Sequence, residues 1–123
     1  LPVVLGDEVA LSQLLQNLIA NGIKFRGHEA PVLDVGSEPE PKQGWWRVWV
    51  KDNGIGIDPA DHNKIFAPFK RLDAGRKFGD SEIGLATCKK IVGQHQGRIW
   101  VESQLGRGTA FYFTLPVFED VKN

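Results

Sequence analysis

The stretch Asp52-Asn53-Gly54-Ile55-Gly56-Ile57 follows directly on a strand-like run and begins a loop. A carboxylate followed by two glycines allows the backbone to approach a planar polar ligand closely, because glycine has no Cβ to intrude. Asp52 can accept a hydrogen bond from an exocyclic amine, and Ile57 can lie against a ring. Glycine-rich turns after strands are more often simple turns, so the pattern is weak alone and depends on the rest of the chain.

The residues before this loop, Trp45 to Asp52, alternate in polarity and are predicted to form a strand. Trp46, Val48 and Val50 share one face, and Asp52 has the same parity, so its carboxylate is expected to point inward. An inward carboxylate needs a partner. A ligand amine and a structural hydrogen bond are equally good partners at this stage.

The composition is that of one globular domain covering residues 1–123. Hydrophobic residues make up 41% and charged residues 24%, and the net charge is zero without any basic block, so no nucleic-acid partner is expected. No apolar run approaches the roughly 20 residues of a membrane helix, so no membrane contact is expected. The single cysteine, Cys88, excludes an intrachain disulfide and fits a cytoplasmic location. The chain begins at Leu1 without Met, so we expect it to be a piece of a longer protein.

A helix is predicted from Glu8 to about Phe25, because apolar residues recur at steps of three and four. Asn17, Asn21 and Lys24 fall within an arc of about 60° that borders this apolar stripe. Asparagine is a poor helix former, so two of them in this row favour a ligand-lining role. A solvated helix flank is the alternative.

The other expected elements form hairpins and two further helices. Strands are predicted at residues 2–5, 32–36, 98–103 and 109–115, a polar connection at 37–44, a short helix at 59–66 and a longer helix at 83–95, with Asp80 or Ser81 as its N-cap. Residues 73–82 are rich in polar and small residues, as expected of a lid over a ligand or of a plain surface loop. Hairpins with helices on one face predict an α+β, two-layer sandwich with a mixed, mostly antiparallel sheet.

Four ordered motifs together resemble the ATP-binding catalytic domain of sensor histidine kinases, which has the Bergerat fold. The resemblance covers nearly the whole chain, and its wording is closest to phytochrome-type kinases. The four motifs are the N box (14–25), the G1 box (52–57), the F box (65–69) and the end of the G2 box (83–92), followed by Gly108-Thr109.

The resemblance implies an ATP-dependent protein-histidine kinase with ATP and Mg²⁺ as cofactors. Adenine would be bound by Asp52, Gly54, Gly56 and Ile57, and Mg²⁺ would be held by Asn21. The phosphates would be met by Asn17, Lys24, Lys70, Arg71, Gly84 and Leu85. The implied partners are the helical dimerisation domain that carries the phosphoacceptor histidine and a downstream response regulator. Phosphoryl transfer depends mainly on positioning and charge neutralisation, which these residue types supply.

The chain departs from the family pattern in its G2 box, where Asp80 and Glu82 stand in place of two glycines. Two like charges 6 Å apart at an effective dielectric of 20 repel by about 3 kcal/mol, which corresponds to about a 100-fold loss of ATP affinity. A scaffold that has lost most of its nucleotide affinity is therefore the second hypothesis. A third is an ATPase of the wider Bergerat group, which is disfavoured because Asn17 stands where those enzymes place a catalytic Glu.

Two further expectations concern residues outside the nucleotide site. His28, His62 and His95 are isolated from one another and are interpreted as surface or structural residues, because no phosphoacceptor box surrounds any of them. Trp49, Trp100 and Tyr112 are expected on the outer face of the sheet, either as an aromatic docking patch or as scattered exposed rings.

Overall fold

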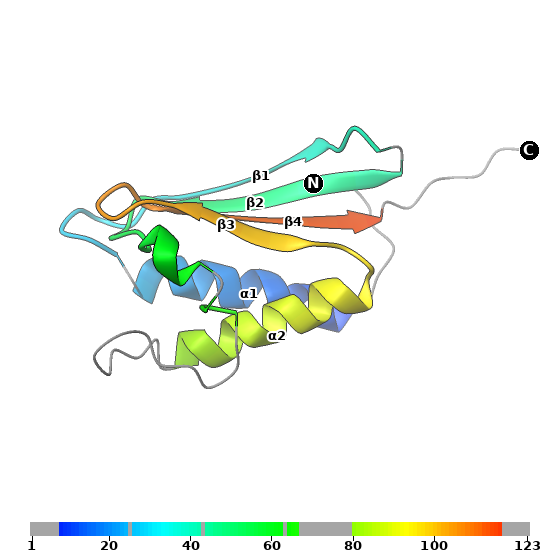
Figure 1. Ribbon diagram of the computed structural model, residues 1–123, viewed down its shortest axis with the longest axis horizontal. Coiled ribbons are helices and arrows are strands. Elements are labelled where there is room, and N and C mark those ends of the chain that lie inside the picture. Colours follow the sequence, from blue (N-terminus) through cyan, green and yellow to red (C-terminus); the bar gives the residue numbers. More distant parts are fainter. Residues whose placement is uncertain (1–7, 25, 43, 63, 67–79, 117–123) are drawn as a thin grey trace, which may run out of the picture.

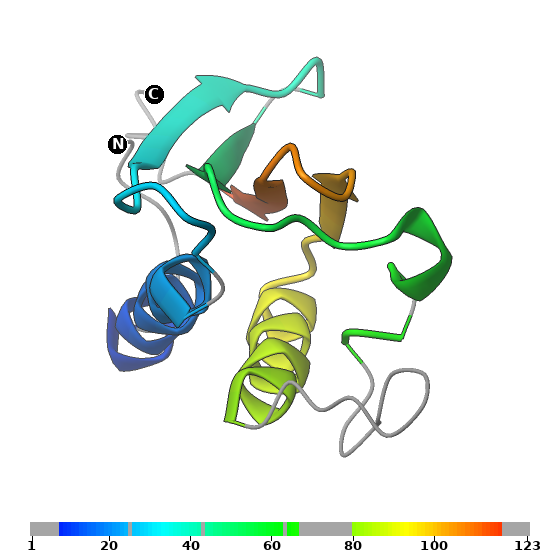
Figure 2. The same cartoon turned by 90° about the vertical axis from the view of Figure 1, so that its left-hand side faces the viewer.

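The computed structural model describes residues 8–24, 26–42, 44–62, 64–66 and 80–116. Helices α1 (Glu8–Lys24) and α2 (Asp80–Gln94) cover one face of a four-stranded sheet (Figures 1 and 2). Its strands are β1 (Leu33–Pro39), β2 (Trp45–Asp52), β3 (Ile99–Ser103) and β4 (Thr109–Pro116), in the order β1-β2-β4-β3. All three pairings are antiparallel. The predicted α+β sandwich is confirmed, and the strand expected at residues 2–5 lies outside the described residues.

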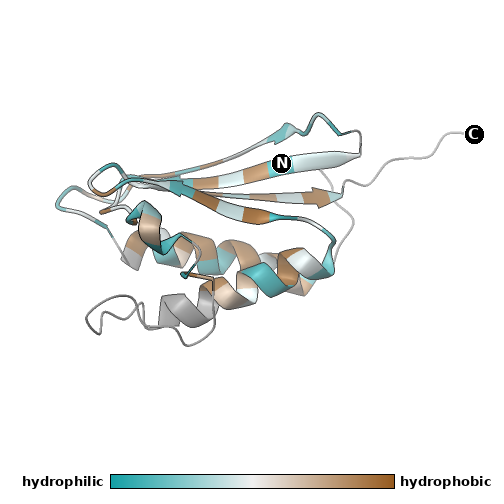
Figure 3. Cartoon of the chain, in the orientation of Figure 1, coloured by the Kyte–Doolittle hydropathy of each residue, from teal (hydrophilic) through white to brown (hydrophobic). Residues whose placement is uncertain are grey.

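The core lies between the sheet and the two helices, and Figure 3 shows hydrophobic residues along both helices and the strands. Helix α1 buries Leu14 and Leu18, and α2 buries Leu85, Cys88 and Val92. The sheet contributes the inward-pointing residues of its two central strands, Val48, Val50, Phe111, Phe113 and Leu115. Each large apolar side chain that is fully buried contributes about 1.5–3 kcal/mol. The helical and alternating patterns in the sequence therefore identified the core correctly.

Strand β1 is longer than the sequence pattern predicts. Residues 37–39, expected in a polar connection, pair with β2 through Ser37–Val48, Glu38–Arg47 and Pro39–Trp46. The register places the Glu38 carboxylate 3.2 Å from the Arg47 guanidinium. Proline is tolerated here because β1 is an edge strand among the described strands and Pro39 is its last residue.

Two helix boundaries also differ from expectation. The helix predicted at 59–66 is a 3₁₀ turn, η1 (Pro59–Asp61), capped by Asp58, whose Oδ1 accepts from the Ala60 N–H at 3.0 Å. Helix α2 begins at Asp80 rather than residue 83. Asp80 and Glu82 therefore lie in its first turn, where acidic residues stabilise a helix through their interaction with its dipole. Ser81 is a residue of the helix and not its N-cap.

The outer face of the sheet carries an aromatic row. Trp49, Tyr112 and Trp100 are register neighbours on three adjacent strands, and the rings of Trp100 and Tyr112 stack with centroids 5.4 Å apart. Lys51 lies 5.0 Å from the Trp49 ring, and Arg98 lies 4.9 Å from the Trp100 ring. The three aromatic residues are partly buried, and cations lie over their rings. Their expected position on the outer face is confirmed, and the choice between a docking patch and separate exposed rings stays a prediction.

Candidate functional site

Asp52 ends strand β2, and its carboxylate is fixed by the backbone that follows it. Oδ1 accepts a hydrogen bond from the Gly54 N–H at 2.8 Å. Burial raises the pKa of the Asp52 carboxyl above its ordinary value, while backbone hydrogen bonds from Gly54 and Thr109 oppose the shift. The structural partner anticipated from the strand parity is therefore present at one oxygen. It aligns a partly desolvated carboxylate that can accept from a ligand amine.

The loop after Asp52 depends on glycine for its path. Gly56 has a φ of +78°, and a Cβ at this position would lie 2.0 Å from the carbonyl oxygen of Gln104. A hydrogen bond of 2.7 Å from the Gly106 N–H to the Ile55 carbonyl joins the same two segments. Since a side chain would force the two backbones apart, Gly56 presses the loop against the hairpin between β3 and β4. Gly54, Gly56 and Ile57 are all buried.

Ser103 holds this loop in place, and sequence reasoning did not find it. Its hydroxyl accepts from the Ile57 N–H at 2.7 Å and donates to the Gly108 carbonyl at 2.8 Å. It also contacts the Thr109 hydroxyl at 3.1 Å. Ser103 is separated from Ile57 by 46 residues, so no local pattern could have revealed the contact. It is a positioning residue for the proposed adenine-binding loop.

Asn53 is a second residue that the sequence reading missed. Its Oδ1 accepts from the Val32 N–H at 2.9 Å, and its Nδ2 donates to the Ala30 carbonyl at 3.1 Å. These two bonds tie the start of the β2 loop to the segment that links α1 to β1. An Asn directly after a strand is a weak signal for such a bridge, because it also fits an ordinary turn.

Helix α1 presents Asn21 and Gly22 at the end where it meets β2. Asn21 is only 5% exposed, and its Oδ1 has no hydrogen-bond partner in the structure. A buried amide oxygen without a partner costs about 1–3 kcal/mol. A Cβ on Gly22 would lie 3.4 Å from Asp52 Oδ2. The end of α1 at Gly22 and the carboxylate at the end of β2 are thus neighbours, and the convergence of Asn21 and Asp52 on one ligand stays a prediction.

Asn17 lies one turn before Asn21, at the contact between the two helices. Its side chain hydrogen-bonds to the Cys88 thiol, whose Sγ also lies 3.8 Å from the Leu14 carbonyl. Burial raises the pKa of the Cys88 thiol to about 12, with the Asn17 contact opposing the shift. Cys88 therefore remains a protonated core residue at neutral pH. Asn17 is half-exposed, and its phosphate role remains a prediction.

The other predicted phosphate ligands are placed less completely. Lys70 and Arg71 lie outside the described residues, as do residues 73–79 of the expected lid, and Lys24 is described only as the last residue of α1. Gly84 and Leu85 lie in α2, and the Leu85 side chain is in the core. In a helix that begins at Asp80, the N–H groups without a partner inside the helix are those of its first turn. The N–H groups of Gly84 and Leu85 are not among them. Their roles also remain predictions.

A divalent metal ion could bind here together with a nucleotide, with only part of its ligands supplied by the protein. The described residues contain no group of three His, Cys, Asp or Glu side chains that could hold a metal ion. Mg²⁺ is ordinarily bound by one or two protein oxygens together with substrate phosphates and water. The unpartnered Oδ1 of Asn21 is an oxygen of the required type, so the residues present fit such an ion.

The sequence matches the family model described as histidine kinase-, DNA gyrase B- and HSP90-like ATPase over residues 6–119. The chain belongs to this ATPase family. It is similar to cyanobacterial phytochrome A of Nostoc sp., with 52% identity over 117 residues that cover 95% of this chain and 15% of that protein. It is also similar to the sensor histidine kinase WalK of Bacillus subtilis, with 40% identity over 119 residues that cover 93% of this chain and 19% of that protein.

Solved structures agree with the sequence comparison. The mycobacterial sensor histidine kinase MprB superposes with a TM-score of 0.79 at 27% identity, covering 93% of this chain and 76% of that one. Full-length ShkA in complex with AMPPNP superposes with a TM-score of 0.77 at 29% identity, covering 99% of this chain and 24% of that one. The fold and sequence of this domain are those of an ATP-binding catalytic domain of the sensor histidine kinase type. The chain spans about a seventh of the phytochrome relative's length.

The part of the chain that the structure describes contains no helix long and apolar enough to cross a membrane.

Proposed function

We propose that this chain binds Mg-ATP where α1 meets the end of β2 and donates the γ-phosphoryl group to a histidine on a separate helical dimerisation domain. The observation that carries the proposal is the buried, unpartnered Oδ1 of Asn21, next in sequence to a glycine that packs on Asp52. A protein does not gain stability from an orphaned buried oxygen, whereas a ligand cation would satisfy it. We further propose that a response regulator receives the phosphoryl group in the cytoplasm.

The proposed division of labour follows from the charges. Asp52 accepts from the adenine amine, and Gly54 and Gly56 admit the ring while Ile57 packs against it. Asn21 would supply one oxygen ligand to Mg²⁺, whose charge would offset that of the phosphates when the ion is bound. A histidine nitrogen of the partner domain forms a bond to the γ-phosphorus as the bond between this phosphorus and the β,γ-bridging oxygen breaks, and ADP leaves with that oxygen. The protein's contribution is alignment of the two reactants and charge stabilisation.

The second candidate function is a scaffold with little nucleotide affinity. It is favoured by one observation, the placement of Asp80 and Glu82 in the first turn of α2. Free N–H groups at a helix start are where phosphate binds best, and two carboxylates in the same turn compete with an anion there. Both candidates share the fold, so they differ only in nucleotide affinity and phosphoryl transfer.

Calorimetric titration with a non-hydrolysable ATP analogue, with and without Mg²⁺, tests the proposal. Micromolar binding that depends on Mg²⁺ and is lost in Asn21→Ala supports a working catalytic domain. No binding at millimolar analogue, restored by replacing Asp80 and Glu82 with Gly, supports the scaffold instead. Transfer of radiolabelled γ-phosphate to a histidine in the parent protein then tests the reaction itself.

A further inference from the structure

A hollow of about 410 Å³ lies between the C-terminal half of α2 and the beginning of β3. Its lining residues in α2 lie in the half of the helix farther from Asp80, and Figure 1 shows the two ends of this helix far apart. None of the residues assigned to the nucleotide lines the hollow. With a rise of 1.5 Å per residue, Val92 lies about 18 Å along the helix axis from Asp80. The lining residues include Lys89, Val92, Gly93, Arg98, Ile99 and Trp100.

The charged residues that line this hollow are all positive. Its lining contains two cations, Lys89 and Arg98, and no carboxylate. Lys89 is exposed and forms no ion pair with any residue that the structure describes. Arg98 lies over the Trp100 ring and reaches Glu40 at 3.3 Å, but its side chain remains 69% exposed. On the outer face of the sheet, the Glu102 carboxylate accepts from the Trp100 indole N–H at 3.2 Å. The hollow is therefore complementary to an anionic ligand.

The hollow borders an open strand edge. Strand β3 pairs with β4 alone among the described strands. The Thr114 N–H donates to the Arg98 carbonyl at 2.9 Å, so Arg98 faces β4 through its backbone. Because hydrogen-bonding direction alternates along an antiparallel strand, the backbone groups of Ile99 and Val101 point to the opposite, unpaired side. No other described backbone group bonds to them. An unpaired edge of this kind is a template for a further strand.

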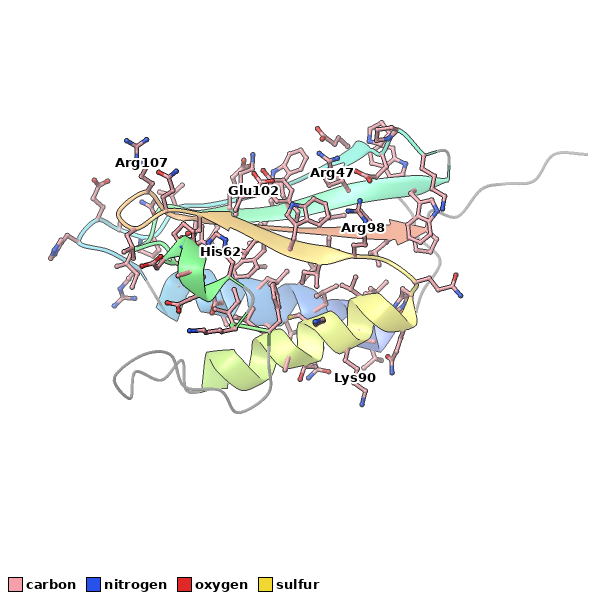
Figure 4. All side chains as sticks on the ribbon, in the orientation of Figure 1. Arg47, His62, Lys90, Arg98, Glu102 and Arg107 are labelled. Carbon is pink, nitrogen blue, oxygen red and sulfur yellow. The ribbon has the colours of Figure 1, made fainter. Side chains whose placement is uncertain are left out.

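The helix beside this edge leaves room for a ligand. A Cβ added to Gly93 of α2 would meet nothing within 4 Å, in contrast to Gly97, where it would lie 2.0 Å from the Thr114 carbonyl oxygen. Lys90 points away from the sheet and takes no part in the lining, whereas Arg98 lies towards the outer face of the sheet (Figure 4). The two lining cations thus come from different layers of the fold.

We propose that this edge binds an extended acidic peptide segment of a partner protein, which adds to the sheet as a strand beside β3. Main-chain hydrogen bonds to Ile99 and Val101 would supply affinity, as in other cases of strand addition. Successive side chains of an added strand point to opposite faces of the sheet. One acidic residue would therefore reach Lys89 on the helix side, and the next would reach Arg98 on the outer side. This site is independent of the nucleotide proposal.

The test is a titration of the isotopically labelled chain, followed by NMR, with a blocked eight-residue peptide that contains two pairs of adjacent glutamates and has valine and threonine at its other positions. Each glutamate pair places one carboxylate on either face of the added strand. We expect binding in the range of about 0.1–1 mM, with the largest shifts at the amides of Ile99 and Val101. The same peptide with lysine in place of glutamate is the charge control and should bind at least about tenfold more weakly. Equal binding of both peptides, shifts centred on Asn21 and Asp52, or no binding at 5 mM would overturn the proposal.

Two matched comparisons, one between protein variants and one between N-methylated peptides, distinguish strand addition from simple charge attraction. Lys89→Glu should weaken the acidic peptide by about tenfold, while Lys90→Glu, an identical charge change outside the lining, should weaken it less than about threefold. N-methylation of alternate peptide residues in one register should abolish binding, and N-methylation in the other register should leave it intact. Equal effects within either pair would rule out the proposed edge site.

Discussion

Gly22 of α1 packs directly on Asp52 of β2. A methyl group at Gly22 would lie 3.3 Å from Asp52 Cβ and 3.4 Å from Oδ2, and 2.7 Å from the end of the Leu33 side chain. Leu33 can rotate away, but Asp52 is held by the Gly54 N–H. The absence of a side chain at Gly22 therefore sets the position of the carboxylate that we assign to adenine.

Gly22→Ala should separate stability from nucleotide binding. The helix gains up to about 1 kcal/mol in propensity, which offsets the cost of moving Leu33, so the free energy of unfolding should change by less than about 1 kcal/mol. Displacing the Asp52 carboxylate by a few tenths of an ångström should weaken a non-hydrolysable ATP analogue by about tenfold. Chemical denaturation and calorimetry measure the two effects.

Gly93→Ala on α2 is the matched control. It is the same substitution in the other helix, but the added methyl group meets nothing within 4 Å. We expect a gain of up to about 1 kcal/mol in stability and no change in nucleotide affinity. Equal affinities for the two alanine variants would contradict the role given to the Gly22–Asp52 contact.

Asp52 should give nucleotide binding and stability opposite dependences on pH. Because the pKa of this carboxyl is raised in the folded protein, affinity for the adenine amine should fall as pH drops through that raised pKa, sooner than for an ordinary Asp. The folded state holds the proton more tightly than the unfolded state. The contribution of Asp52 to stability is therefore present below its unfolded pKa of about 3.9 and is lost as pH rises through the folded pKa.

Asp52→Asn is the control for both pH effects. The amide has no titration in this range, so the acid-side loss of nucleotide affinity and the matching change in unfolding free energy should both disappear. Affinity at neutral pH should fall about tenfold or more, since the amide is a weaker acceptor than a carboxylate. An unchanged pH profile in Asp52→Asn would assign the titration to another group.

Asn21 should matter for the metal and little for the fold. Asn21→Ala removes an oxygen that has no partner, so the unfolding free energy without nucleotide should change by less than about 1 kcal/mol. The increase in ATP-analogue affinity on adding Mg²⁺ should be lost. Titrations of the analogue at several Mg²⁺ concentrations give this dependence directly.

Asn53→Ala is the control for Asn21→Ala, because the expected effects on stability and on Mg²⁺ dependence are the reverse. Asn53 makes two hydrogen bonds to the segment before β1, so its loss should destabilise the chain by about 1–2 kcal/mol. The Mg²⁺ dependence of binding should persist. A destabilised Asn21→Ala with normal Mg²⁺ dependence would make Asn21 a structural residue and remove the main support for the metal site.

The elements predicted correctly are those whose periodicity is local. The α1 stripe and the alternation of β2 and β4 each have a clean period, and the structure buries most of the described residues that these periods select, with Leu11, Leu15 and Trp46 only partly buried. The errors fall where another part of the chain decides the outcome. Residues 37–39 read as a turn because of Pro39, yet β2 is long enough to pair with them.

The site divides in the same way. Asp52, Gly54, Gly56 and Asn21 could be proposed as site residues from the sequence because carboxylates, glycines and asparagines at strand and helix ends are informative residue types, and their roles stay predictions. Ser103 and Asn53 could not, because a hydroxyl or an amide that bonds backbone 46 or 21 residues away leaves no local pattern. The aromatic row was placed on the correct face, but Arg47 reaches the Trp100 ring from a strand that is not adjacent in the sheet, which no local pattern reveals.

Ser103→Ala tests whether the adenine loop depends on the hairpin between β3 and β4. The hydroxyl serves the Ile57 N–H and the Gly108 carbonyl, and its removal leaves both without that partner. We expect a loss of about 1–3 kcal/mol in stability, together with a fall of about tenfold in ATP-analogue affinity as Ile57 shifts. Ser103→Thr retains the hydroxyl and should recover most of the affinity. Since stability alone could lower apparent binding, affinity is measured well below the melting temperature, and there a Ser103→Ala chain that binds as tightly as the original would show that Ile57 is held by other contacts.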